Sequence, residues 1–193
     1  KVLAAIQLMV VARLLTPADF GVMAASATIV LAFMTISELG LESALIAKAE
    51  VGQKDLAVAW TVAIVRGVVM AACLFAGADM IGQAMQMPQL ASLLRVHAWL
   101  LVLHGLQSPA MALVLKKLDL RLRVTMDLVR RVIEAGAIVA LALWLRNVWA
   151  LLLGQLLGMC VGSLLSFWVA PFRPRLSLHR PARDYFLRYG KHL

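Results

Sequence analysis

The chain has 193 residues, of which 63% are hydrophobic and 15% are charged, and its formal net charge is +9. Its mean hydropathy of +0.88 excludes a soluble domain, because a chain of this length cannot bury that much apolar surface in one core. Lipid solvates such a surface, so we expect an all-α integral membrane protein. The basic residues lie between apolar runs, which is typical of membrane topology and argues against a nucleic-acid partner.

The two cysteines, Cys73 and Cys160, both lie inside apolar runs. The sequence contains no CxxC motif and no cluster of His and Cys, so it indicates neither a metal site, nor a disulfide framework, nor a cofactor. The first apolar run lacks a basic n-region and an A-x-A site, so we expect no cleavable signal peptide.

Six apolar segments predict six transmembrane helices, which together form one lobe over residues 1–170. Their approximate bounds are 2–15, 20–39, 56–77, 93–115, 128–146 and 148–170. The first segment is too short for a hydrocarbon core of about 30 Å, so we expect it to be the second half of a span. Residues 171–193 are basic and rich in proline, and are expected to form a cytoplasmic connection towards a seventh span.

Two short polar stretches predict tight turns between neighbouring spans. In "ARLLTPADFG", Thr16 is a suitable N-cap, Pro17 suits the first helical position, and Asp19 completes a capping box. The pair Arg146-Asn147 divides the long apolar run from residue 132 to residue 170, which predicts a helical hairpin.

Lysine and arginine fall mainly on one side of this six-helix plan. The connections after the second and fourth spans, together with the tail, hold 14 of these residues, and the other three connections hold 2. The positive-inside rule places the richer side in the cytoplasm. We expect the basic run from Lys116 to Arg131 to lie over anionic lipid headgroups.

Three stretches of the sequence resemble bacterial polysaccharide exporters, the lipid-linked oligosaccharide flippases of the multidrug/oligosaccharidyl-lipid/polysaccharide exporter superfamily. They are "ARLLTPADFGVMAASATIVLAFMTISELGLESALI", "VWALLLGQLLGMCVGSLLSFWVAPFRPRLSL" and "YFLRYGKHL". The resemblance implies two six-helix lobes around a central cavity and alternating access that carries a lipid-linked glycan across the inner membrane. This chain corresponds to the N-terminal lobe, so the resemblance implies a C-terminal lobe as partner and no independent activity.

A flippase of this kind needs polar side chains at membrane depth, and Arg66 lies near the centre of the third predicted span. An arginine there costs at least about 2.5–3.5 kcal/mol to insert, so it is expected to face protein or water. One interpretation is a contact to the pyrophosphate or an acidic sugar of the cargo. The alternative is a structural pair with a carboxylate such as Glu38 or Glu134.

The fourth predicted span carries a polar stripe. His97, His104 and Ser108 lie within about 40° of one face of an ideal helix, and Gln107 is adjacent to them. Pro109 predicts a kink at the end of the stripe. Such a stripe suits a cavity wall, but hydrogen bonds between helices would explain it equally well. A histidine proton relay is a third interpretation.

Acidic residues occur at two further places. Glu38 and Glu42 lie one turn apart at the inner end of the second span, where they either couple transport to a cation or pair with the basic loop that follows. Glu134 follows Arg130 by four positions and Arg131 by three, which favours a local ion pair.

The sixth span contains Gly154, Gly158 and Gly162 in a G-x-x-x-G-x-x-x-G pattern. Small residues at this spacing form a flat face that lets helices approach closely. We interpret the face as packing within the lobe, with dimerisation as the alternative.

The leading functional hypothesis is therefore a non-enzymatic transporter of a lipid-linked oligosaccharide in the bacterial inner membrane. A drug or small-molecule exporter of the same superfamily is the alternative, but it would be expected to carry acidic residues deep in its first lobe. A membrane enzyme such as a glycan polymerase ranks last, because the predicted outer connections are short, the longest being about residues 78–92.

Overall fold

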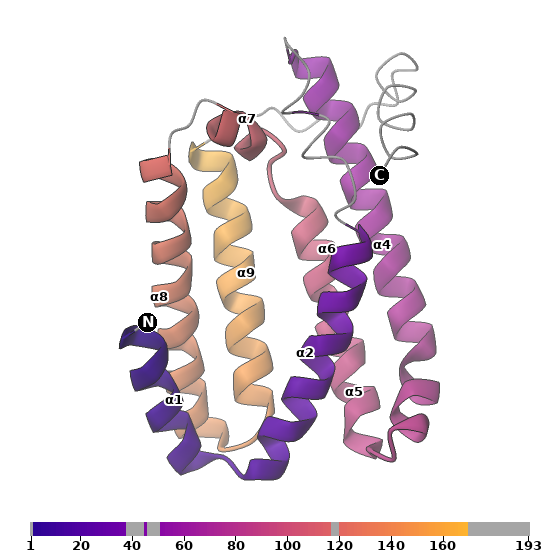
Figure 1. The fold of residues 1–193 in the computed structure, drawn as a ribbon, viewed down its shortest axis with the longest axis vertical. Helices are drawn as coiled ribbons and strands as arrows, with labels where there is room; N and C mark the ends of the chain where they lie inside the picture. The colour runs from indigo at the N-terminus through magenta and orange to yellow at the C-terminus, as the bar shows by residue number, and fades with distance from the viewer. Residues whose placement is uncertain (1, 38–44, 46–50, 117–119, 170–193) are drawn as a thin grey trace.

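The computed structural model describes residues 2–37, 45, 51–116 and 120–169, and within these ranges the regular secondary structure is helical (Figure 1). The helices are α1 (Val2–Leu14), α2 (Pro17–Ser37), α4 (Gln53–Ala84), α5 (Pro88–His97), α6 (Trp99–Leu106), α7 (Met111–Lys116), α8 (Leu120–Leu145) and α9 (Trp149–Val169). The predicted all-α membrane fold is confirmed. The predicted boundary at residue 170 and the tail after it lie outside the described residues.

Each of the six expected spans corresponds to a helical rod, but several of the helices extend beyond the expected bounds. The third span is longer than expected, because α4 has 32 residues. The fourth starts earlier, at Pro88, and is broken twice, at Ala98 and at residues 107–110. The second break contains Pro109, which has no backbone N–H to donate and clashes with the preceding turn. The fifth span also begins earlier, at Leu120.

Four segments of the described chain are long and apolar enough to cross a membrane: Pro17–Thr35, Gln53–Ala84, Pro88–Leu106 and Trp149–Trp168. The remaining two rods differ from them for separate reasons. The helix α1 has only 13 residues. The helix α8 is long enough, but its first half, LRLRVTMDLVRRVIE, is strongly charged. For these two rods the span assignment rests on the sequence pattern.

The predicted turn between α1 and α2 is confirmed. The Thr16 N–H donates to Asp19 Oδ2 at 3.0 Å, and the Asp19 N–H donates to Thr16 Oγ1 at 3.3 Å. This reciprocal pair is the predicted capping box, and it satisfies two backbone donors at the start of α2.

The other two turns at this end of the molecule are equally short. The predicted hairpin at Arg146-Asn147 is confirmed: Arg146 has φ 49°, and Asn147 Oδ1 accepts from the Trp149 N–H at 3.1 Å, at the start of α9. The α4–α5 turn occupies only residues 85–87, so the longer connection expected there was wrong. The Gly82 carbonyl closes this turn by accepting from the Met87 N–H at 2.9 Å.

The helices form two groups that enclose a space at one end. Helices α1, α8 and α9 pack together, as do α2, α4, α5 and α6, and α9 joins the groups by contacting α5 and α6 (Figure 1). Near the three short turns the interior is filled by leucines with no exposed surface, which include Leu74, Leu90, Leu94 and Leu152. The half of the bundle next to these turns is therefore closed, and a cavity lies in the other half.

Candidate functional site

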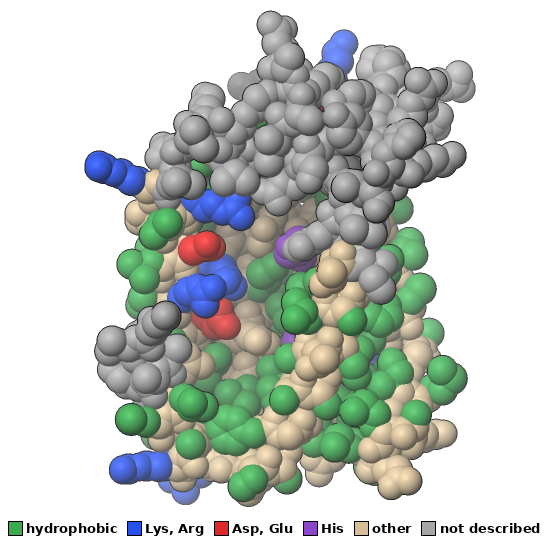
Figure 2. All heavy atoms as spheres, in the orientation of Figure 1, with side chains coloured by type: hydrophobic (Ala, Val, Ile, Leu, Met, Phe, Trp, Pro, Cys, Tyr) green, Lys and Arg blue, Asp and Glu red, His purple; other side chains and the backbone are tan. Residues whose placement is uncertain are grey.

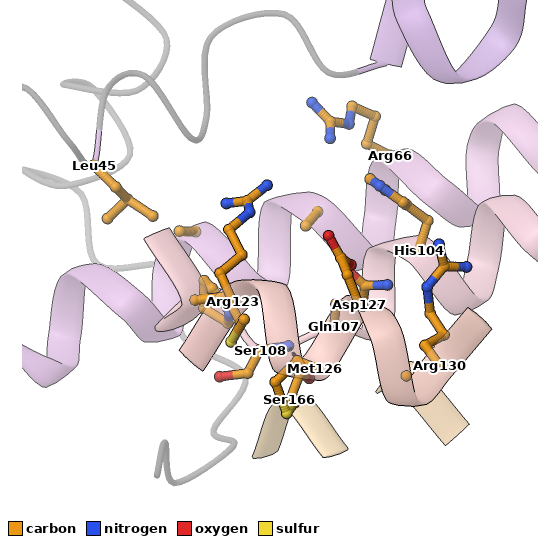
Figure 3. Close-up of a pocket in the computed structure, with 15 residues that line it drawn as sticks. Leu45, Arg66, His104, Gln107, Ser108, Arg123, Met126, Asp127, Arg130 and Ser166 are labelled. Atoms are coloured by element: carbon orange, nitrogen blue, oxygen red, sulfur yellow. Dashed lines mark hydrogen bonds between the residues drawn. The ribbon is translucent and has the colours of Figure 1, made fainter. Parts of the chain in front are cut away.

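A cavity of about 290 Å³ lies between α4, α6, α8 and α9. Its polar and charged lining residues come from four helices and the break after α6 (Figure 3). They are Arg66, His104, Gln107, Ser108, Arg123, Asp127, Arg130 and Ser166. The structure therefore brings four of the five sequence-predicted cavity residues together and adds three charged residues from α8. Their role as substrate contacts stays a prediction.

A close crossing of α4 and α6 positions two of the basic side chains. A Cβ atom built on Gly67 would lie 2.6 Å from the Leu101 carbonyl oxygen, and one built on Gly105 would lie 2.6 Å from the Ala63 carbonyl oxygen. Only glycine therefore fits at either position. Arg66 precedes Gly67 and His104 precedes Gly105, so this backbone contact fixes the separation of the two basic residues.

The break between α6 and α7 forms a second part of the wall. The Ser108 N–H lies in this break, and it donates to Ser166 Oγ of α9 at 2.9 Å. The Gln107 amide Nε2 lies 3.6 Å from Met159 Sδ, also on α9. Trp60 Nε1 donates to the Leu106 carbonyl at 3.2 Å, which satisfies an acceptor in the last turn of α6. The break is thus held by side chains from both neighbouring helices.

Helix α8 presents a stripe of alternating charge to the cavity. Arg123, Asp127, Arg130 and Glu134 follow one another at spacings of four, three and four residues, which places them on one face of the helix. The first three line the cavity, and Figure 3 shows them extending to the same side of α8. Arg123 and Arg130 of the basic run therefore line the cavity, and the position of the run over anionic lipid headgroups stays a prediction. The spacing of these charges by three and four residues is the sequence feature that could have placed them on one face of the helix.

The glycine pattern in α9 faces α8, within the lobe. A Cβ built on Gly154 would lie 2.9 Å from the Ile138 Cα, and one built on Gly158 would lie 2.6 Å from Glu134 Cβ. The last of the three, Gly162, also lines the cavity, and its Cβ would lie 2.7 Å from Arg130 Cδ. Two of the glycines therefore hold the aliphatic stems of the two charged residues whose heads form an ion pair.

That ion pair was predicted from the sequence and is confirmed. Arg130 Nη1 lies 3.3 Å from Glu134 Oε2, and the two side chains are 27% and 21% exposed. In the surface view, basic and acidic side chains alternate over α8 beside a hollow, whereas the surface nearer the short turns is largely hydrophobic (Figure 2). Charge is therefore concentrated at the open half of the bundle.

His97 was predicted to share the cavity wall and does not. It is 1% exposed, and its Nδ1 lies 2.7 Å from the Ser26 hydroxyl of α2. The Gln155 side chain of α9 lies close enough to interact with the same ring. His97 is two helical turns below His104, in the closed half where α2 and α9 pack on α5. The alternative reading, hydrogen bonding between helices, is therefore correct for this residue.

The two candidates for ion coupling, Glu38 and Glu42, lie outside the described residues. Within the ranges the structure describes, no three His, Cys, Asp or Glu side chains gather closely enough to hold a metal ion.

The sequence matches a family profile described as "Polysaccharide biosynthesis protein" over residues 10–193. It is also 27% identical, over 108 residues, to the lipopolysaccharide biosynthesis protein WzxC of Escherichia coli (strain K12). That alignment covers 55% of this chain and 22% of WzxC, so the matched region is about a fifth of the relative's length. No solved structure matches the chain.

Proposed function

Because the chain belongs to the polysaccharide biosynthesis protein family, we propose that it is the first lobe of an exporter that flips a lipid-linked glycan across the bacterial inner membrane. The similarity to WzxC, a lipopolysaccharide biosynthesis protein, supports this proposal. In this role the protein breaks no covalent bond in its cargo. It shelters the polar headgroup in a protein cavity while the lipid tail stays in the bilayer.

The observation that carries the proposal is the charge of the cavity. Three arginines, Arg66, Arg123 and Arg130, line it, against one lining carboxylate, Asp127, among the described residues. A guanidinium group binds phosphate oxygens through paired N–H donors, so this set favours a diphosphate or an acidic sugar. The volume of about 290 Å³ is at the lower end for ligand pockets, which suits a headgroup better than a whole oligosaccharide.

The depth of the cavity also supports the proposal. Trp168, which is 87% exposed near the end of α9, suits the membrane–water interface, where tryptophan is enriched. Gly162, which touches the Arg130 stem, is six residues earlier, or about 9 Å deeper along the helix. Gly158, which touches Glu134, is about 15 Å deeper, near the middle of a bilayer. Charged residues at such depth are costly and are functional candidates by default.

The proposed orientation places the half of the bundle that holds the cavity on the cytoplasmic side. That half carries the charged start of α8 and the connections richest in Lys and Arg, and the short turns mark the opposite end. The cavity then receives cargo from the cytoplasmic leaflet. Arg121 and Arg131, which are exposed on α8, remain available for anionic lipid headgroups in this orientation.

An exporter of cationic drugs is the alternative, and Asp127 is the lining carboxylate that such a cargo would contact. The surplus of arginine disfavours a cation there, because like charges repel. An anionic cargo is therefore the better match to the described lining.

The proposal is tested by replacing Arg66 in the product of the complete gene and measuring glycan export per molecule, with protein abundance measured in parallel. Arg66→Lys should retain partial export, because a point charge still attracts phosphate, and Arg66→Gln should lose most of it at normal abundance. Arg95→Gln is the matched control, since Arg95 pairs with Asp79 on the surface and does not line the cavity. Normal export by an abundant Arg66→Gln protein would contradict the proposal.

The orientation is tested with single cysteines at three exposed positions in intact cells. Cysteines at Gln53 and Arg121 should resist a membrane-impermeant thiol reagent, and one at Gln89 should react. The opposite labelling pattern would reverse the orientation.

The need for a second lobe is tested by complementation. Alternating access requires two lobes that move against each other, so we expect the 193-residue chain alone not to restore export in a cell that lacks its exporter. Rescue by this chain alone, without self-association, would contradict that part of the proposal.

A further inference from the structure

The Arg130–Glu134 pair has a geometry that makes it easy to exchange. The contact between Arg130 Nη1 and Glu134 Oε2 is 3.3 Å, longer than the 2.7–2.9 Å or so of a strong charge-assisted hydrogen bond. The arginine also precedes the glutamate by four residues, which is the weaker order for an ion pair on a helix. The carboxylate therefore holds the guanidinium loosely.

The stems of both side chains are confined while their heads are not. Gly162 and Gly158 of α9 lie directly against the Arg130 Cδ and the Glu134 Cβ, so neither stem can move closer to α9. Arg130 lines the cavity, and both side chains keep about a quarter of their surface exposed. Rotation about the last torsions of Arg130 is thus the motion available for changing partners.

A phosphate or diphosphate in the cavity competes with Glu134 for the same guanidinium. It offers two oxygens to the paired N–H donors, whereas Glu134 accepts at 3.3 Å. We infer that Glu134 is a temporary counterion of Arg130. It pairs with the guanidinium when the cavity holds no cargo, and the phosphate group of the cargo replaces it when cargo binds. This inference rests on the proposed function, because it requires an anionic cargo at that place.

The consequence is a limit on affinity. Glu134 weakens anion binding by the free energy of the pair that must be broken, and it recaptures Arg130 when the cargo leaves. A transporter needs this balance, because cargo bound too tightly is not released. Glu134 is therefore expected to speed release at the expense of affinity.

The test measures binding of inorganic pyrophosphate to the purified product of the complete gene in lipid nanodiscs. Glu134→Gln should bind pyrophosphate about two- to fivefold more tightly than the unmodified protein, the range expected for losing one partly exposed ion pair. Arg130→Gln should bind more weakly. The double variant should bind as Arg130→Gln does, because without Arg130 there is no guanidinium to release.

Asp127→Asn is the matched control, since it removes one negative charge from the same helix face. The gain in pyrophosphate affinity from Asp127→Asn should largely persist when Arg130→Gln is also present, because Asp127 acts through the electrostatic potential of the whole cavity. If the Glu134→Gln gain also persists there, Glu134 acts only through its charge and the inference is wrong. If Glu134→Gln weakens binding, Glu134 merely positions Arg130 and the inference is equally wrong.

Two further readouts complete the test. If Glu134→Gln does not fold, Glu134→Asp replaces it in the test. The shorter side chain reaches Arg130 less well, so a smaller gain in pyrophosphate affinity is expected. This gain should disappear when Arg130→Gln is also present. At saturating cargo, export per molecule should fall in Glu134→Gln despite tighter binding, whereas a structural defect would reduce both.

Pyrophosphate binding that neither Arg66→Gln nor Arg130→Gln weakens would refute the proposed function itself. If Arg130→Gln weakens pyrophosphate binding as expected and Glu134→Gln leaves it unchanged, this inference alone is refuted.

Discussion

Replacing Gly154 with alanine should destabilise the contact between α8 and α9. The added Cβ would lie 2.9 Å from both the Cα and the backbone N of Ile138, atoms that can move only with α8 itself. Overpacking of this kind costs about 1–3 kcal/mol. Alanine also improves helix propensity by about 1 kcal/mol, which partly hides the clash.

Gly136→Ala on α8 is the control that separates these two effects. A Cβ at Gly136 has no neighbour within 4 Å, so this variant gains helix propensity without a clash. The difference in unfolding free energy between the two variants, measured by denaturant titration in detergent, should therefore be about 1–3 kcal/mol. Equal stability of the two would refute the close α8–α9 contact.

The other glycines of the stripe should follow in a fixed order. Gly158→Ala meets the Glu134 Cβ at 2.6 Å, an atom nearly as fixed as the backbone, so its stability loss should approach that of Gly154→Ala. Gly162→Ala meets the Arg130 Cδ at 2.7 Å, near the end of a flexible chain. Gly162→Ala should therefore cost least in stability and should change anion binding most, because it displaces Arg130.

Two further predictions concern the closed half of the bundle. Ser26→Ala removes the hydroxyl partner of the buried His97 Nδ1 and should lower the free energy of unfolding in detergent by about 1 kcal/mol, with little effect on pyrophosphate binding; a binding defect at normal stability would instead connect this pair to the cavity. Asp19→Ala removes the side-chain acceptor of the Thr16 N–H and should cost about 0.5–2 kcal/mol, measured in the same way, whereas no loss would mean that the turn needs no cap.

The sequence predicted the helical rods and two of the three short turns because those features depend on local chemistry. Lipid requires long apolar helices, and the capping residues at Thr16 and Asn147 mark where two of them begin. The helix ends were less predictable. Gln53 and Leu120 start their helices within polar sequence, which hydropathy alone assigns to loops.

The candidate site was predicted only in part, because contacts between distant helices decide it. Arg66 and His104 were found from their polarity in apolar segments. His97 has the same polarity but faces Ser26, and nothing in its local sequence distinguishes it from His104. The glycines at 67 and 105 fix the crossing of α4 and α6, yet each is an isolated glycine in the sequence.

Helix α8 carries six charged residues, and four of them share one face. The face that contains Arg123 and Arg130 turns towards the cavity and the glycines of α9, which leave space for these side chains. The other face of the helix exposes Val124, Leu128 and Val132, which are between 49% and 63% exposed, together with the exposed Arg121 and Arg131. Average hydropathy mixes these two faces, so α8 is not among the described segments that are apolar enough to cross a membrane, whereas the spacing of its charges shows that four of them share one face. The feature that weakens the membrane signal of α8 is therefore the same feature that builds the cavity wall.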